Sequence, residues 1–129
     1  MTAKDSVRWC VDGREGARIP ADDRGLAYGD GLFETIAVLD GAPRLLEHHL
    51  DRLTEGARRL AIPARRGELR TLLRQEAASL GCGVLKLLLS RGSGPRGYAP
   101  PAAPTPRLIT GATPRGGEFA ALSDEPIRV

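Results

Sequence analysis

The strongest constraint on the fold is a pair of helical patterns lying between β-type segments. Apolar residues recur at intervals of three and four over residues 46–60 and again over residues 66–80, the period of a helix with one buried face. Ile62 and Pro63 separate the two patterns, and Gly81 is placed to cap the second. Short apolar or β-branched segments occupy residues 7–11, 32–39, 84–90 and 107–110. This order predicts an α+β domain with a mixed or antiparallel sheet covered on one face by two helices.

Turn-forming residues separate the other predicted elements of the chain. Two Asp-Gly pairs, Asp12-Gly13 and Asp40-Gly41, follow strand-like segments and predict hairpin turns. The second turn should lead into a return strand over residues 43–45. We expect loops where turn-forming residues are dense, and a last strand beginning near the end of the chain. The loops are residues 20–30, 92–106 and 112–124, and the strand is 126–129.

Composition narrows the class of protein. With 129 residues, 41% apolar and 27% charged, the chain has the size and make-up of one soluble domain. No apolar run approaches the roughly 20 residues of a membrane helix, and the first residues lack a signal-peptide core, so we expect a cytoplasmic protein without a membrane partner. The net charge of +3 comes from scattered arginines with few aromatics between them, which argues against nucleic acid. Cys10 and Cys82 lack metal-site spacing, and we expect buried or half-buried thiols and no metal.

The segment GSGPRG at residues 92–97 matches the dinucleotide fingerprint G-x-G-x-x-G. That fingerprint needs a helix directly after the glycines, because the helix N-terminus holds the pyrophosphate. Prolines crowd residues 100–106 and exclude a helix there. The segment is therefore not a nucleotide site. Either it offers Arg91, Arg96 and Tyr98 to a carboxylate, or it is a surface loop whose arginines pair with water or nearby acids.

Three further positions invite a functional explanation. Arg52 falls at the edge of the apolar stripe of the first helix, where it could bind a phosphate or carboxylate, pair with a neighbouring acid, or reach along the surface to water. Lys86 shares a strand face with apolar neighbours, so it faces a polar cavity or reaches water at a sheet edge. Phe33 and Glu34 point to opposite faces of their strand, and one of them should face the core.

Three spaced motifs together resemble a known family. They are DRGLAYGDGLFETI at residues 23–36, HLDRL at residues 49–53 and SRGSGPRGY at residues 90–98. In this order they are similar to the N-terminal half of the class IV (fold-type IV) aminotransferases, which use pyridoxal 5'-phosphate. Within that family they look most like the 4-amino-4-deoxychorismate lyases of folate biosynthesis. The resemblance covers essentially all 129 residues.

The resemblance implies roles for five residues. Arg52 occupies the position of the arginine that binds the cofactor phosphate. Arg96 and Tyr98 match the loop residues that reach toward the substrate carboxylate, with Arg91 in support at the base of that loop. Phe33 matches an aromatic residue near the cofactor or substrate.

The resemblance also implies a domain organisation and an activity. Residues 1–129 should be the N-terminal (small) domain, with the C-terminal domain and its Schiff-base lysine absent from this chain, which should be inactive alone. Lys86 matches a different lysine of the lyases. The complete enzyme, expected to be a homodimer, would release pyruvate from the dicarboxylate 4-amino-4-deoxychorismate to form p-aminobenzoate. The alternatives are a branched-chain or D-amino-acid aminotransferase, or a stand-alone binding module without catalysis.

Overall fold

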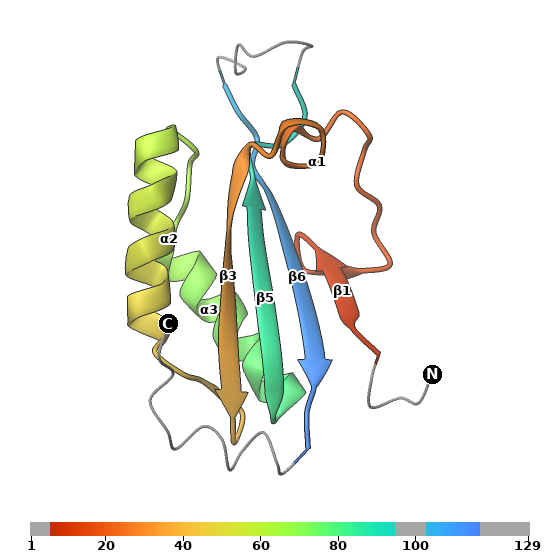
Figure 1. The fold of residues 1–129 in the computed structure, drawn as a ribbon, viewed down its shortest axis with the longest axis vertical. Coiled ribbons are helices and arrows are strands. Elements are labelled where there is room, and N and C mark those ends of the chain that lie inside the picture. Colours follow the sequence, from red (N-terminus) through yellow and green to blue (C-terminus); the bar gives the residue numbers. More distant parts are fainter. Residues whose placement is uncertain (1–5, 95–102, 117–129) are drawn as a thin grey trace.

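The centre of the fold is a six-stranded antiparallel sheet with the strand order β2-β1-β6-β5-β3-β4. The structure is a computed structural model that describes residues 6–94 and 103–116 (Figure 1). The strands are β1 (Arg8–Val11), β2 (Arg14–Glu15), β3 (Gly31–Leu39), β4 (Ala42–Pro43), β5 (Gly83–Ser90) and β6 (Arg107–Pro114). A short strand does follow the second turn, but it is β4 over Ala42–Pro43, and the predicted residues Arg44 and Leu45 lie outside it, with Leu45 preceding the helix that begins at Leu46. Because all strand pairs in this sheet are antiparallel, the sheet is of the antiparallel rather than the mixed type.

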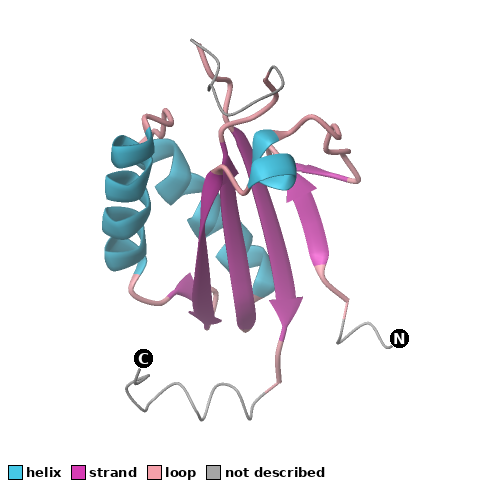
Figure 2. Ribbon diagram, turned by 45° about the horizontal axis from the view of Figure 1, so that its top comes forward, coloured by secondary structure: helices cyan, strands magenta, loops and turns pink. Residues whose placement is uncertain are grey.

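Two long helices form the second layer. Helix α2 (Leu46–Leu60) lies beside β3, and helix α3 (Arg66–Leu80) crosses behind the strands, so both lie on one side of the sheet (Figures 1 and 2). Between the layers, apolar side chains of both helices and of the central strands are fully buried: Ile36, Val38, Leu50, Leu73, Leu85 and Leu87. The predicted α+β fold is confirmed, and so are the boundaries of both helices.

Both Asp-Gly pairs form the expected hairpin turns. The φ angles are +51° at Asp12, +79° at Gly13, +49° at Asp40 and +73° at Gly41. Positive φ at both central residues is what a type I′ turn requires, and this turn matches the twist of the strands that it joins. The first turn joins β1 to β2 and the second joins β3 to β4.

The structure corrects the predicted loops at two places. Residues 20–30 contain a short helix, α1 (Arg24–Tyr28), whose N-cap Asp23 accepts a hydrogen bond from the Leu26 amide at 3.0 Å. Five residues are too few to show a helical period, so the pattern did not reveal α1. Strand β6 continues to Pro114 instead of ending at Thr110. The predicted strand at residues 126–129 lies outside the described residues.

The glycine in the middle of β6 explains why that strand was predicted too short. A Cβ atom at Gly111 would lie 2.6 Å from the ring of Trp9, which packs across it from β1. Glycine is therefore needed for this close approach, although glycine usually weakens a strand prediction.

Other expectations concern single side chains and the membrane. Cys10 is buried and Cys82 is half-buried, as predicted. Of the helices in the described ranges, none has both the length and the apolar character needed to cross a membrane.

The second face of the sheet is turned to the viewer in Figure 1. Phe33 and Thr35 of β3 and Lys86 of β5 are exposed on this face, and Trp9 of β1 is also exposed. We call it the open face. The exposed side chains of this face do not pack in the core.

Candidate functional site

The candidate site lies where the upper part of β3 meets α2. Strand β4 pairs only with Val38 and Leu39 of β3. Within the part of the chain that the structure describes, no strand therefore continues along the outer edge of β3 over residues 31–36. Helix α2 lies beside this edge (Figure 1). Side chains from the open face, from the helix-covered face and from α2 can thus approach a single ligand.

A buried carboxylate organises the helix side of this edge. Glu34 of β3 points toward α2 with a side chain only 4% exposed. Arg52 donates to it from two nitrogens, Nε to Oε1 at 2.7 Å and Nη2 to Oε2 at 2.6 Å. The Nδ1 atom of His49 lies 2.9 Å from Oε2. Of the pair Phe33 and Glu34, the residue that faces the core side is therefore the charged one, because α2 supplies partners for it.

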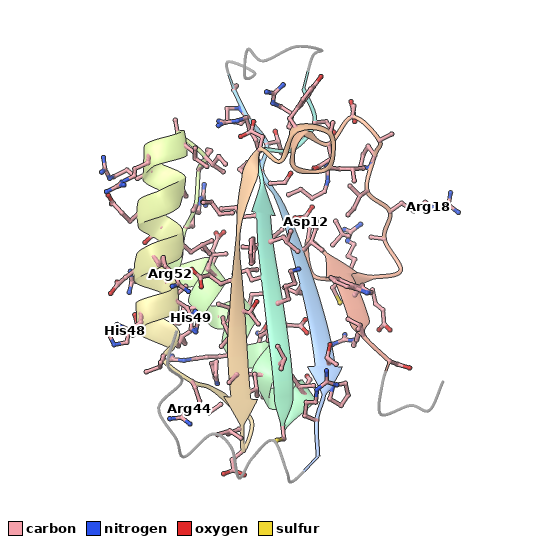
Figure 3. The ribbon with its side chains drawn as sticks, in the orientation of Figure 1. Asp12, Arg18, Arg44, His48, His49 and Arg52 are labelled. Atoms are coloured by element: carbon pink, nitrogen blue, oxygen red, sulfur yellow. The ribbon has the colours of Figure 1, made fainter. Side chains whose placement is uncertain are left out.

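The two histidines of α2 differ in what they face. His49 and Arg52 lie on the part of α2 that faces β3, whereas His48 points away from the sheet (Figure 3). His48 is exposed, as its position in the helical pattern indicates. His49 is mostly covered and contacts the carboxylate, a role that the sequence pattern did not reveal.

Electrostatics keep the Glu34 carboxyl ionised. Burial raises the pKa of the Glu34 carboxyl, but hydrogen bonds and positive charge from Arg52 and His49 outweigh burial and place the pKa below its ordinary value. The hydrogen bond to Glu34 in turn raises the pKa of Arg52. Glu34 is therefore a carboxylate at neutral pH, and its bond to Arg52 is an ion pair.

Within residues 6–94 and 103–116, Arg52 keeps donors that no other group uses. Its side chain is 73% exposed, and among the described residues Glu34 is its hydrogen-bonding partner, through Nε and Nη2. Both hydrogens of Nη1 and the second hydrogen of Nη2 then face away from the carboxylate, because guanidinium is planar. The neighbouring acids have other partners: Asp51 pairs with Arg66, and Glu55 with Arg58. The free edge of Arg52 fits a phosphate or a carboxylate.

The open face presents an aromatic ring beside a cation. Phe33 is 65% exposed, and the Nζ atom of Lys86 lies 5.3 Å from the centre of its ring. Lys86 is opposite Thr35 in the β3–β5 register, so these groups form one surface. The distance is that of a cation–π contact, which leaves the ammonium free to attract an anion.

A second cluster of charges closes the end of the sheet. Arg91 follows β5, and its side chain is 8% exposed. Its Nε donates to Asp30 at 2.7 Å, its Nη2 to the Leu60 carbonyl at 2.7 Å and its Nη1 to the Ala61 carbonyl at 3.3 Å. Arg24 donates to the same carboxylate at 2.9 Å. The structure therefore places Arg91 inside the protein, where it joins β5, the segment before β3 and the end of α2.

Asp23 joins the two strand ends, of β5 and β6, from which the loop over residues 92–106 begins and to which it returns. It accepts hydrogen bonds from the Ser90 hydroxyl and from Arg107, which lie at the facing ends of β5 and β6. Gly92 has a φ of +91°, and a Cβ there would collide with the Thr105 carbonyl. The two ends of the loop over residues 92–106 are thus fixed together. Arg96 and Tyr98 lie within this loop but outside the described residues.

The strand pattern contains a signal for Glu34, which was not among the predicted site residues. Glu34 is in the same strand phase as Leu32, Ile36 and Val38, which point toward the helices. A carboxylate in a core-facing phase requires partners, since burying an unpaired charge is costly. The pattern could therefore have pointed to a charge pair at Glu34. It could not have named Arg52 as the partner, because that contact spans 18 residues and depends on how α2 packs.

A separate hollow lies away from this edge. It has a volume of about 500 Å³ and lies near the first turn of α3, lined by Ala64, Arg65, Leu69, Leu72, Pro106 and Leu108 among others. None of Phe33, Arg52 and Lys86 lines it. The charged groups Glu34, His49 and Arg52 therefore meet at the edge of β3 and not at the hollow.

Comparison with known proteins defines the class. Residues 31–122 match the family described as amino-transferase class IV. This match covers most of the chain, and the chain belongs to that family. Enzymes of this class use pyridoxal phosphate.

Particular relatives share both sequence and fold. The chain is 38% identical over 114 residues to the bifunctional aminodeoxychorismate lyase / D-amino acid transaminase of Mycobacterium tuberculosis, covering 81% of this chain and 39% of that protein. The crystal structure of 4-amino-4-deoxychorismate lyase from Pseudomonas aeruginosa is 58% identical with a TM-score of 0.79, covering 84% of this chain and 40% of that one. The PLP-bound form of a hypothetical aminotransferase from Mycobacterium tuberculosis is 28% identical with a TM-score of 0.63, covering 91% and 43%. The chain thus spans about two fifths of these relatives.

Proposed function

We propose that this chain forms part of an aminodeoxychorismate lyase, a pyridoxal-phosphate enzyme that releases pyruvate from 4-amino-4-deoxychorismate to form p-aminobenzoate. The observation that carries the proposal is the outward-facing edge of Arg52, beside the outer edge of β3 that no described strand covers over residues 31–36. The 58% identity to the Pseudomonas aeruginosa lyase favours this reaction over others of the class.

Arg52 fits the cofactor phosphate by the chemistry of its donors. Three N–H groups remain after the bond to Glu34, and a guanidinium matches the geometry and charge of phosphate. When bound, pyridoxal phosphate supplies an electron sink for the reacting carbon of the substrate. The contribution of Arg52 is to hold the phosphate end of the cofactor and so to fix its position against the sheet.

The open face and the loop over residues 92–106 suit the substrate. The substrate is an unsaturated six-membered ring that carries one carboxylate directly and a second on its enolpyruvyl side chain. Phe33 offers an exposed apolar surface for the ring, and Lys86 offers a positive charge next to it. We propose that Arg96 and Tyr98 bind a carboxylate from the loop.

We propose a different role for Arg91 from the one that the family resemblance implied. All three of its nitrogens donate to groups of this chain, and the side chain is buried. In this proposal Arg91 and Asp30 support the base of the substrate loop, and Arg91 itself does not bind substrate.

The remaining groups of the enzyme are proposed to come from outside residues 1–129. We propose that these residues are the N-terminal domain and that a second domain brings the lysine that anchors the cofactor. The chain covers about two fifths of its relatives, which is consistent with this organisation. We further propose that the complete enzyme acts as a homodimer in the cytoplasm.

The test is a product assay on the full-length protein. Incubation with 4-amino-4-deoxychorismate should yield p-aminobenzoate, which is read by its fluorescence after chromatography. Pyruvate alone is not diagnostic, because transamination of D-alanine also yields it. A protein that leaves this substrate unchanged would contradict the proposal.

A D-amino-acid transaminase is the second candidate. It is favoured by the Mycobacterium tuberculosis relative, whose name includes both activities. A parallel incubation with D-alanine and a 2-oxo acid tests it. Amino transfer without p-aminobenzoate formation would replace the lyase with the transaminase, and both products together would indicate a bifunctional enzyme.

A further inference from the structure

We infer that Glu34 is a positioning residue that fixes the direction in which Arg52 presents its free edge to an anion. The inference rests on the proposed role of Arg52 at the cofactor phosphate. It assigns no direct contact to Glu34, whose side chain is buried between β3 and α2.

The geometry of the ion pair determines the direction of the guanidinium. Glu34 binds the side of the group that carries Nε and Nη2, at 2.7 and 2.6 Å. Two parallel hydrogen bonds to one carboxylate fix the plane of a guanidinium as well as its position. The end of the group, with Nη1 and the remaining hydrogen of Nη2, is then held in a single orientation toward solvent.

This constraint matters because, among the residues that the structure describes, Glu34 is the group that holds the Arg52 guanidinium. Its side chain is 73% exposed and belongs to a long, flexible type that loses rotamer freedom whenever it binds a ligand. A side chain that is already ordered by Glu34 loses less of that freedom on binding phosphate, so the complex is tighter.

The carboxylate is itself firmly held. Glu34 lies in the middle of the β3–β5 pairing, opposite Leu87, whose side chain is in the core. His49 contacts its Oε2 at 2.9 Å from the preceding turn of α2. Because Glu34 is fixed in the sheet, its two hydrogen bonds hold the exposed side chain of Arg52 in place on the surface of α2.

A purely structural role for Glu34 makes a different prediction. If the ion pair only fastens α2 to β3, its loss should weaken binding of pyridoxal phosphate and of pyridoxal to the same extent. A positioning role affects the phosphate selectively, because pyridoxal has no phosphate to bind. The ratio of the two affinities is thus a measurement that a structural role would not change.

The experiment titrates pyridoxal phosphate and pyridoxal separately into the full-length protein, its Glu34→Gln variant and a matched Glu55→Gln control. Glu55 likewise accepts two hydrogen bonds from one arginine of α2, from Nε of Arg58 at 3.0 Å and from its Nη2 at 2.8 Å. Both of these side chains are on the exposed side of the helix. We expect Glu34→Gln to weaken pyridoxal phosphate binding about tenfold, the low end of the roughly 10–100-fold effect of residues that orient metal ligands. Pyridoxal binding should not change, and the control should change neither. Equal weakening of both ligands, or no change, would overturn the inference.

A second set of variants separates this inference from the proposed function. Arg52→Ala should lower the affinity ratio, and adding Glu34→Gln to it should lower the ratio no further, because Glu34 acts through Arg52. An unchanged ratio in Arg52→Ala would remove the phosphate role itself. A lowered ratio in Arg52→Ala with an unchanged ratio in Glu34→Gln would remove only the inference.

A conservative variant keeps the inference testable if Glu34→Gln does not fold. Glu34→Asp retains the negative charge that pairs with α2 but shortens the side chain by one methylene, which draws the guanidinium inward. We expect a folded protein with an affinity ratio between those of the wild type and Arg52→Ala. A wild-type ratio in Glu34→Asp would count against positioning.

Discussion

Arg52 and Arg91 each bind a carboxylate through Nε, yet their remaining donors differ. The Arg52 side chain is 73% exposed, and the edge that Glu34 leaves free faces outward. The Arg91 side chain is 8% exposed, and its Nη atoms donate to two backbone carbonyls near the end of α2. An ion pair alone therefore does not identify a ligand site. The donors that remain after the ion pair is made distinguish an arginine that can bind a ligand from one that supports the scaffold.

The partner carboxylates show the same contrast. The Asp30 carboxyl has its pKa lowered mainly by the hydrogen bond from Arg91, with Arg24 adding to the effect. For Glu34 the largest influence is burial, which raises the pKa, and the partners from α2 more than offset it. Asp30 serves two arginines that hold the loop base, whereas Glu34 directs one arginine outward.

The largest effect on folding should come from the buried arginine. Arg91→Ala leaves the Leu60 and Ala61 carbonyls without their donor and Asp30 with Arg24 alone. We expect the free energy of unfolding to fall by about 3 kcal/mol, the low end of the range for breaking a buried ion pair. Urea unfolding followed by circular dichroism measures this. Arg91→Lys should recover only part of the loss, since lysine cannot replace three directed donors. If Arg91→Ala were as stable as the wild type, Arg91 would not have the supporting role that distinguishes it from Arg52.

The largest effect on ligand binding should come from the exposed arginine. Arg52→Ala should weaken binding of pyridoxal phosphate to the full-length protein by about 10–100-fold, the value of one lost charge-assisted interaction. It should cost much less folding stability than Arg91→Ala, because His49 still contacts Glu34. Absorbance titration and thermal unfolding of the same samples give both numbers. If Arg91→Ala and Arg52→Ala had the same profile, the two arginines would not have separate roles.

A pH series should detect the low pKa of Glu34. Because the pKa of Glu34 is lower in the folded protein than its ordinary value of about 4.3, the ion pair stabilises the fold above that pH. Its contribution should decline as the pH falls below about 4.3 and through the lower pKa of the folded state. The difference in unfolding free energy between wild type and Glu34→Gln should therefore be constant from pH 7 to pH 5 and shrink below pH 4. A difference that shows no decline as the pH falls below 4 would show that charge is not its source.

The smallest effect should come from a third arginine–carboxylate cluster. Glu47 of α2 binds Arg66 and Arg70 of α3, and these partners lower its pKa to about 2. The cluster is exposed, and exposed ion pairs contribute little and are screened by salt. We expect Glu47→Gln to change stability barely measurably at low salt and not at all at 1 M salt. A large loss of stability in Glu47→Gln would mean that a low carboxyl pKa is enough to identify an ion pair that stabilises the fold. That result would contradict the view that burial and the remaining donors decide what an ion pair does.

The sequence predicted the layers of the fold better than the short elements at its edges. The helices over residues 46–60 and 66–80 were predictable because fifteen residues display a period clearly. Helix α1 has only five residues, and the extension of β6 depends on Trp9 packing over Gly111. Such short or contact-dependent elements leave no periodic trace in the sequence.

Some residues of the candidate site could be predicted from the sequence, but their arrangement could not. The position of Arg52 beside an apolar stripe left an anion as one of several partners, and the family motif pointed to the cofactor phosphate. Alternation places Glu34 in the strand phase of Ile36 and Val38, but it could not show which groups would pair with a charge there. The answer depends on α2 supplying His49 and Arg52 to the buried carboxylate, a contact between distant parts of the chain. The same holds for Arg91, whose partners come from two separate segments, Asp30 before β3 and the Leu60 and Ala61 carbonyls at the end of α2.

The most direct test of the central claim is the ³¹P NMR signal of pyridoxal phosphate bound to the full-length protein, recorded as a function of pH. A phosphate monoester ordinarily loses its second proton with a pKa near 6. A bound guanidinium favours the dianion, so the signal of the wild-type complex should not move between pH 7.5 and about 5.5. In Arg52→Ala the signal should titrate within this range, and in Arg91→Ala it should stay fixed as in the wild type. Identical pH profiles for wild type and Arg52→Ala would contradict the claim that Arg52 holds the cofactor phosphate.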